Sequence, residues 1–195
     1  MRLATLPDGA RRDGRCVVVS DDGATCRPVG RMTLQDLLDA DGGADAIAAH
    51  LGPPERFDRG RALASLPRAA GFLDGSAYVN HVDLVRRARG ETLPERFWTD
   101  PLMYQGCAAF DPPAAPIPAA PDWGADFEAE VAVVTGDVPR GVSAAEAGAS
   151  IRLVTLVNDV SLRGLIPDEL SKGFGFVHGK PPSAMAPLAV TPDDL

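Results

Sequence analysis

The sequence contains few residues of the kinds that build disulfide frameworks, zinc sites and aromatic binding surfaces. Of its 195 residues three are cysteine and three are histidine, and aromatic residues make up 6%. Cys16, Cys26 and Cys107 are odd in number and lack the spacing of a metal site, so we expect reduced thiols in a cytoplasmic protein. The histidines are too scattered along the chain to predict a zinc site.

Long apolar runs and excess positive charge are also missing. No apolar run approaches the roughly 20 residues of a membrane span, and the N-terminus lacks the apolar centre of a signal peptide. The net charge of −8 argues against nucleic acid and anionic membranes as partners. Hydrophobic residues reach 45%, with 20 glycines and 18 prolines. This composition predicts a real core in an α+β, β-rich and turn-rich protein.

The first part of the chain predicts a small N-terminal β/α domain over residues 1–72. Residues 2–6 and 15–19 are apolar runs separated by Asp8-Gly9, which predicts two strands and a turn. Thr33 with Asp36 three residues later predicts a capped helix, and residues 44–51 predict another.

Residues 73–195 form the second predicted region. Ser76 is expected to cap a helix that ends at Gly90, and the prolines of residues 111–122 predict an extended connector. Residues 127–134 and 151–159 predict strands, separated by a short helix capped by Ser143 and Glu146.

The strongest chemical signal is a set of acids near these strands. Glu128 and Glu130 are two residues apart, so on a strand they point to the same face about 6 to 7 Å apart. A cation between them would relieve their repulsion, and Asp159 at the end of the next strand could complete the cluster. With Asp74, the set has only oxygen ligands, as Mg²⁺ and Ca²⁺ prefer.

The alternative interpretation is an exposed strand face with ordinary charges. It makes the other face, Ala129, Val131 and Val133, the natural core face. Against it, Ala132 and Val134 continue the acidic face as apolar residues, which predicts that this face is buried at one end. Single residues are ambiguous in the same way: a lone histidine is more often packed or exposed than catalytic, and a lone lysine or arginine is often solvated.

Taken together, several stretches are similar to the fumarylacetoacetate hydrolase family. In the family's order, over about residues 74–190, they are Asp74-Gly75-Ser76-Ala77-Tyr78-Val79-Asn80-His81, Arg89-Gly90, Pro101-Leu102-Met103-Tyr104-Gln105-Gly106, Phe127-Glu128-Ala129-Glu130, Val157-Asn158-Asp159-Val160-Ser161-Leu162-Arg163 and Gly179-Lys180.

The resemblance implies a role for each matching residue. The metal ligands would be Asp74, Glu128, Glu130 and Asp159, holding Mg²⁺ or Ca²⁺, with Mn²⁺ as a further option. The water-activating residue would be His81. The residues that bind the oxo-acid substrate would be Arg89, Tyr104, Arg163 and Lys180.

The resemblance also implies a fold and an activity. Residues 73–195 would form the N-terminal part of the family's mixed β-roll, and the full-length protein would be a homodimer. The implied reaction is hydrolysis of a carbon–carbon bond in a 1,3-dioxo acid such as fumarylacetoacetate, giving fumarate and acetoacetate, in tyrosine or other aromatic degradation. Ser76 and Ile166 depart from the family pattern, where a tyrosine and a glutamine are usual. Because family members continue well beyond Leu195, we expect a truncated chain, poorly active or inactive alone.

Three other functions stay open. An oxo-acid decarboxylase or tautomerase of the same family would share the metal ligands. A glycosidase would use Glu128 and Glu130 as acid and base, although such pairs normally come from different elements and sugar sites favour aromatic residues, which are scarce here. A metal-stabilised interaction module without catalysis is the third.

Overall fold

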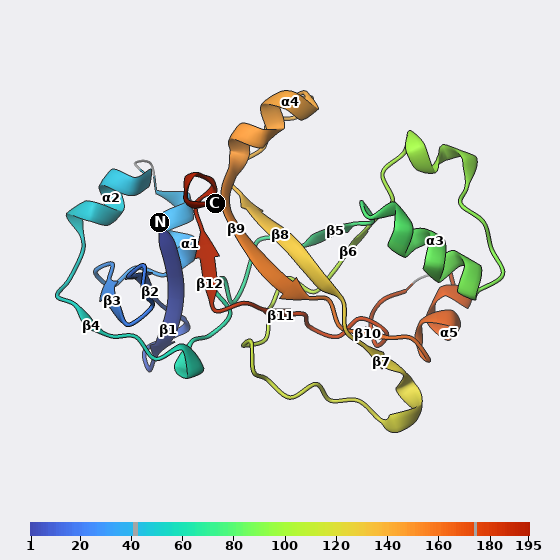
Figure 1. The fold of residues 1–195 in the computed structure, drawn as a ribbon, viewed down its shortest axis with the longest axis horizontal. Coiled ribbons are helices and arrows are strands. Elements are labelled where there is room, and N and C mark those ends of the chain that lie inside the picture. Colours follow the sequence, from blue (N-terminus) through green and yellow to red (C-terminus); the bar gives the residue numbers. More distant parts are fainter. Residues whose placement is uncertain (41–42, 174) are drawn as a thin grey trace.

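The computed structural model describes residues 1–40, 43–173 and 175–195 and shows an α+β, strand-rich fold (Figure 1). The largest sheet has eight strands in the order β11-β9-β12-β1-β2-β3-β4, with β8 on the other side of β9. Its strands pair antiparallel, which confirms the predicted β-rich class. Two short two-stranded sheets, β5-β6 and β7-β10, lie beside it.

The first elements lie at the left of Figure 1 and follow the sequence prediction closely. They are β1 (Arg2–Asp8), β2 (Arg11–Val19), β3 (Thr25–Pro28), α1 (Leu34–Asp39), α2 (Gly43–Ala49), β4 (Glu55–Arg56) and the 3₁₀ turn η1 (Arg59–Arg61). The predicted capping box at the start of α1 is present, because Thr33 Oγ1 accepts from the Asp36 amide and Asp36 accepts from the Thr33 amide.

The remaining elements surround β8 and β9. They are β5 (Leu73–Gly75), α3 (Val79–Ala88), η2 (Glu95–Trp98), β6 (Met103–Gln105), η3 (Pro121–Trp123), β7 (Ala125–Asp126), β8 (Ala129–Thr135), α4 (Ala144–Ala147), η4 (Gly148–Ser150), β9 (Ile151–Asn158), β10 (Ser161–Leu162), α5 (Ile166–Ser171), β11 (Ala184–Met185), β12 (Leu188–Val190) and η5 (Pro192–Asp194).

Strand β12 joins the two parts of the chain into one sheet. Val190 pairs with Arg2 of β1 on one side and with Val154 of β9 on the other. A shared hydrophobic cluster fills the space beneath, with Leu3 and Leu34 from the first part and Leu153, Val157 and Met185 from the second. The predicted division at residues 1–72 and 73–195 stays a prediction; in this structure both parts contribute to this shared cluster.

The two faces of β8 are the reverse of the core assignment made from the alternation. Val131 and Val133, expected on the core face with Ala129, are 58% and 51% exposed. Ala132 and Val134 pack against the hydrophobic cluster instead. Register explains the reversal: Ala132 and Val134 lie opposite Thr155 and Leu153, which are two of the three buried residues of β9. The acidic face is therefore the buried face, as Ala132 and Val134 indicated.

The start of α3 also differs from the prediction. The helix begins after Tyr78, which makes no side-chain capping bond, so Ser76 is not its cap. The Ser76 amide instead donates to the Leu102 carbonyl, which extends the β5-β6 pairing by one contact. The predicted end is correct, because Gly90 takes a φ of 74° after the last turn.

Cys16 and Cys26 are buried and Cys107 is exposed, all as free thiols. Within residues 1–40, 43–173 and 175–195, no helix has the length and apolar character needed to cross a bilayer.

We predict opposite outcomes for two leucines three residues apart on β9. Leu153→Ala removes a 3% exposed side chain from the core and should lower the free energy of unfolding by about 2–5 kcal/mol. Leu156→Ala, on the 59% exposed face, should change it by less than about 0.5 kcal/mol. Urea denaturation of both variants measures this, and equal losses would contradict the assignment of faces.

Candidate metal centre

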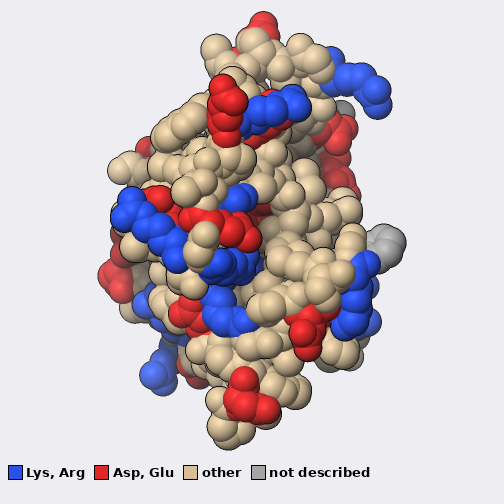
Figure 2. Space-filling model, turned by 90° about the vertical axis from the view of Figure 1, so that its right-hand side faces the viewer, with Lys and Arg blue, Asp and Glu red and all other residues tan. Residues whose placement is uncertain are grey.

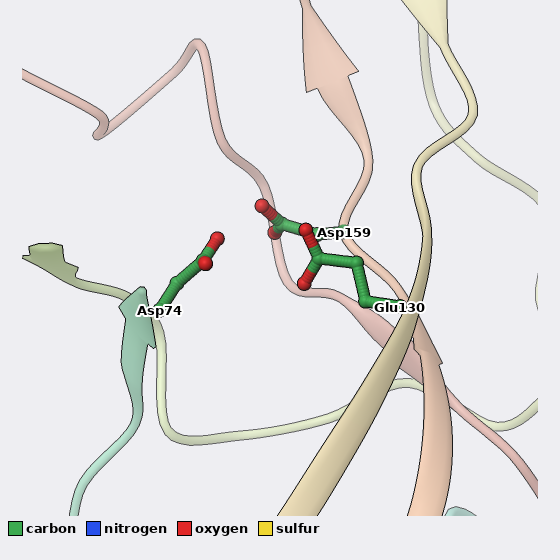
Figure 3. A group of neighbouring side chains, drawn as sticks. All are labelled: Asp74, Glu130 and Asp159. Atoms are coloured by element: carbon green, nitrogen blue, oxygen red, sulfur yellow. The ribbon is translucent and has the colours of Figure 1, made fainter. Parts of the chain in front are cut away.

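Three carboxylates from distant parts of the sequence converge at one end of β8 and β9 (Figure 3). Asp74 lies on β5, Glu130 on β8, and Asp159 directly after β9. Strand pairing places them: Glu130 is opposite Val157, two residues before Asp159. Asp74 is opposite Tyr104 on β6, whose hydroxyl donates to Asp159 Oδ2 at 2.6 Å. Asp74, Glu130 and Asp159 are called the acidic trio below.

The acidic trio has the geometry and chemistry of a hard-cation site. One carboxylate oxygen from each residue lies within 4.8 Å of one from each of the others. Oxygens that share one Ca²⁺ at about 2.3–2.6 Å can be up to about 5 Å apart. The ligand set contains only oxygen, which suits Mg²⁺, Ca²⁺ or Mn²⁺. The residues therefore fit a divalent metal ion.

The electrostatics of the acidic trio also favour a cation. Burial, together with the charges of Asp74 and Asp159, raises the pKa of Glu130 to about 7. Burial and the neighbouring Asp159 raise the pKa of Asp74 to about 6. Both shifts mean that the carboxylates resist ionisation without a compensating charge, and a divalent ion supplies that charge.

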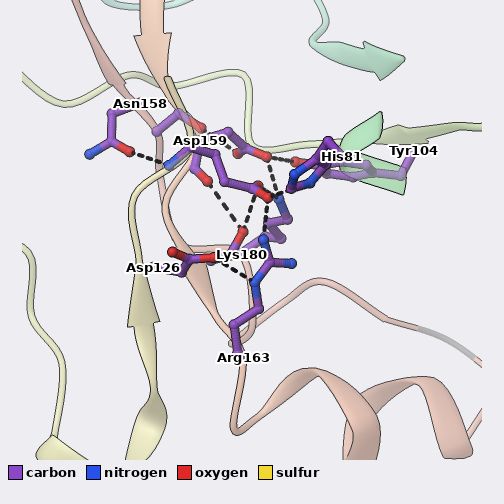
Figure 4. Close-up of polar contacts among 10 residues, drawn as sticks. His81, Tyr104, Asp126, Asn158, Asp159, Arg163 and Lys180 are labelled. Carbon is purple, nitrogen blue, oxygen red and sulfur yellow. Dashed lines mark hydrogen bonds and ion pairs between the residues drawn. The ribbon is translucent and has the colours of Figure 1, made fainter. Parts of the chain in front are cut away.

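Asp159 is the most firmly held of the three. It is 1% exposed, and Ser183 Oγ donates to its Oδ1 at 2.8 Å. Its Oδ2 accepts from the Tyr104 hydroxyl and from Lys180 Nζ (Figure 4). Burial and the hydrogen bond to Asp159 raise the pKa of Tyr104, so the phenol stays protonated and acts as a donor.

Glu128 belongs to a neighbouring network of positive groups. Its side chain is 9% exposed, with Lys180 Nζ 2.7 Å and Ser161 Oγ 2.8 Å from Oε2. Oε1 contacts Arg163 and lies 3.0 Å from His81 Nε2. Burial alone would raise the pKa of Glu128, but the bonds from Lys180 and Ser161 lower it to about 2. Among the described residues, the acidic trio forms without Glu128, so its role as a fourth ligand stays a prediction.

Lys180 and Arg163 each contact carboxylates and still have N–H donors that make no such contact. Lys180 Nζ contacts Glu128 and Asp159, and although burial lowers its pKa, these bonds raise it overall. Arg163 Nε donates to Asp126 at 3.0 Å and its Nη2 to Glu128. An ammonium has three donors and a guanidinium five, so each group retains N–H bonds for a substrate oxygen.

The remaining predicted residues lie on or beside α3. His81 is on this helix, with a 52% exposed side chain that reaches Glu128. Arg89 is the C-terminal cap of α3 and is exposed, and no ion pair joins it to any residue of 1–40, 43–173 or 175–195. The structure thus brings together every predicted site residue except Arg89. The roles assigned to them stay predictions.

Several polar residues of the network were not predicted as site residues. The sequence could have indicated Asp126 and Ser161 by their spacing. Asp126 is two residues before Glu128, and Ser161 is two residues after Asp159. Ser183 and Glu169 gave no such signal. Glu169 accepts from the amides of His178 and Gly179, at 2.7 and 2.9 Å, and thereby holds the loop that carries Lys180.

An aromatic residue in the same loop has an unusual backbone. Phe176 has a φ of 61°, and its ring lies 4.8 Å from that of Tyr104 between centroids. A bulky residue in this region is uncommon and points to local constraint at the site.

The surface on the α3 side carries both signs of charge (Figure 2). Arginines and acids lie next to each other there, as in the Arg87–Asp83 pair on α3 at 2.6 Å and the Arg86–Glu91 pair at 3.2 Å. Arg86 and Arg87 in the last turn of α3 are thus paired with acids on a partly solvated helix face.

Comparison with known proteins identifies both halves of the chain. Residues 71–195 match the model of the fumarylacetoacetate (FAA) hydrolase C-terminal domain, and residues 1–68 match that of fumarylacetoacetase N-terminal domain 2. Among curated proteins, none matches the chain in sequence.

Solved structures match the whole fold. A protein from Mycobacterium smegmatis provisionally assigned as HpcE is 22% identical with a TM-score of 0.70, over 100% of this chain and 68% of that one. Maleylpyruvate hydrolase from Sphingobium sp. SYK-6 is 19% identical with a TM-score of 0.65, over 100% and 68%. A 5-carboxymethyl-2-hydroxymuconate delta-isomerase from Mycobacterium smegmatis is 22% identical with a TM-score of 0.60, over 98% and 67%. The chain spans about two thirds of these relatives' length.

We predict that acid weakens metal binding at this centre. Metal ligands must be ionised, and protons compete for Glu130 and Asp74, with pKa values of about 7 and about 6. Lowering the pH from about 8 to about 5.5 should weaken Mn²⁺ affinity roughly 100-fold, which isothermal titration calorimetry measures. Affinity independent of pH would contradict this assignment of ligands.

Glu130→Gln should stabilise the metal-free protein above neutral pH. The folded pKa of about 7 exceeds the ordinary 4.5, so the folded state binds more protons and loses stability as pH rises from 4.5 through 7. The amide removes that loss, and it also removes stabilisation by Mn²⁺. Thermal unfolding with and without Mn²⁺ tests both effects, with the exposed Glu95→Gln as the control of equal charge.

Proposed function

The chain belongs to the fumarylacetoacetate hydrolase family, and from this premise we propose that it is a metal-dependent hydrolase that cleaves a carbon–carbon bond in a 1,3-dioxo acid. Fumarylacetoacetate, which gives fumarate and acetoacetate, is the proposed substrate type. The observation that supports this most is the acidic trio with three basic side chains beside it. These are His81, Arg163 and Lys180, and each of them contacts Glu128.

The proposed ligands are the acidic trio, with Glu128 as a fourth. The metal would be Mg²⁺ or Ca²⁺, with Mn²⁺ as a substitute. Such an ion, when bound, polarises the carbonyl that is attacked and offsets charge on the substrate oxygens.

His81 is the proposed general base. It accepts a proton from water as the water oxygen bonds to the carbonyl carbon, and after the carbon–carbon bond breaks it returns a proton to the departing carbon. Its contact with the ionised Glu128 orients the ring. Atoms balance: one water is consumed and two acids are formed.

The positive groups are proposed to bind the substrate. Lys180 and Arg163 place free N–H donors beside the acidic trio, where negative charge develops on oxygen. The Tyr104 hydroxyl is already oriented towards the same point by its bond to Asp159. Arg89, at the end of α3, is proposed to act on the outer part of the substrate.

A second candidate is an isomerase, tautomerase or decarboxylase of small oxo acids. It is favoured by the solved neighbours, which include a delta-isomerase as well as a hydrolase. Product analysis with fumarylacetoacetate, fumarylpyruvate and oxaloacetate separates these reactions. Release of fumarate from the dioxo acids supports the hydrolase, and turnover of oxaloacetate alone supports the decarboxylase.

The biological setting proposed here follows the family resemblance. We propose a cytoplasmic homodimer that acts in tyrosine or other aromatic breakdown.

His81→Ala should remove catalysis and leave the metal centre intact. Loss of the general base is expected to lower kcat by about 10²–10⁴-fold. Mn²⁺ affinity should change little, because His81 contacts Glu128 rather than the acidic trio.

His50→Ala is the matched control, since His50 is exposed and its Nδ1 contacts the Ala46 carbonyl far from the centre in sequence. Where the His50→Ala control has measurable turnover, equal turnover by His81→Ala would refute the assignment. Activity that survives exhaustive chelation would refute the metal requirement.

A further inference from the structure

We propose that Ser183 is a positioning residue of the metal centre, which together with Lys180 clamps Asp159 through both carboxylate oxygens. The inference rests on the proposed metal-dependent function and deepens it, because it concerns how one ligand is held in place. The pair Lys180 and Ser183 is called the Asp159 clamp below.

The contacts divide the carboxylate between the two residues. Ser183 Oγ donates to Oδ1 at 2.8 Å, while Lys180 Nζ contacts Oδ2. Ser183 is 2% exposed and Asp159 1% exposed, so no bulk water competes for these bonds. Oδ1 has no other donor among residues 1–40, 43–173 and 175–195.

The spacing between the two donors is stiff. Pro181 and Pro182 separate them, and each proline fixes its own φ and restricts the residue before it. Both ends of this segment are tied to the fold by the backbone. The Leu162 amide donates to the Gly179 carbonyl at 2.8 Å, and the Asp111 amide donates to the Ser183 carbonyl at 3.0 Å.

The Asp159 clamp and Tyr104 together leave Asp159 one direction in which to bind a cation. A carboxylate offers about four lone-pair sites, and Ser183, Lys180 and Tyr104 occupy three of them. Without the Ser183 hydroxyl, the carboxylate can turn about its bond, and Oδ1 is left buried without a donor. Loss of such an orienting partner typically weakens metal affinity by about 10–100-fold.

No metal-ligand pattern in the sequence reveals Ser183, because its neighbours are two prolines and an alanine. Its importance arises from a contact across 24 residues of sequence.

The test measures Mn²⁺ binding by isothermal titration calorimetry and by the electron paramagnetic resonance of free Mn²⁺. The variants are Ser183→Ala and Ser183→Cys, the second of which keeps the side-chain size but donates weakly. Ser65→Ala is the matched control, because Ser65 is 0% exposed and its hydroxyl lies 3.4 Å from Thr155 Oγ1, away from the acidic trio. Thermal unfolding of each variant shows that it is folded.

The expected result is a loss of Mn²⁺ affinity of about 10-fold or more in both Ser183 variants, and less than about 3-fold in Ser65→Ala. Unchanged affinity in a folded Ser183 variant overturns the inference alone, since wild-type protein still binds the metal. Failure of wild-type protein to bind Mn²⁺ overturns the proposed function, and this inference with it.

Discussion

The site depends on one lysine that offsets the repulsion among buried carboxylates. Lys180 contacts both Glu128 and Asp159, and all three side chains are less than 10% exposed. Two like charges at this depth destabilise the fold unless a positive group lies between them. Lys180 serves two acids, and Arg163 serves Glu128 from the other side. Asp74 and Glu130 receive no such partner among the described residues, and the raised pKa values of both acids follow from that.

The topology of the sheet explains why several acidic side chains lie close together at one place. Strand β9 lies between β8 on one side and β11 and β12 on the other, so the ends of several connections meet where β9 stops. Asp159 comes directly after β9, Glu130 enters from β8, and Ser183 precedes β11. Only Asp74 comes from a separate sheet, through its pairing with Tyr104. The fold of the core therefore determines the geometry of the site.

Much of this was visible in the sequence, because it depends on local patterns. Apolar runs predicted the strands β1, β2, β8 and β9, and cap chemistry predicted the capping box at Thr33. The order of motifs shared with the family predicted that Asp74, Glu130 and Asp159 converge. Alternation alone did not show which face of β8 meets the core; only the apolar Ala132 and Val134 on the acidic face indicated it. Ser183 and Glu169 were missed for a related reason: their partners are set by loop packing, which leaves no periodic signal.

The contrast between Glu128 and Glu130 shows how position within one segment separates two roles. They are two residues apart, yet the pKa of Glu128 is lowered to about 2 and that of Glu130 is raised to about 7. Burial acts on both in the same direction. The difference arises because Lys180, Ser161 and Arg163 contact Glu128 and not Glu130, whereas the charges of Asp74 and Asp159 raise the pKa of Glu130 further. Glu128 is thus a permanent anion that can orient His81, while Glu130 is ready to ionise when a cation arrives. Under the proposed function, a site with both properties would take up a metal ion at the acidic trio while Glu128 keeps its contact with His81.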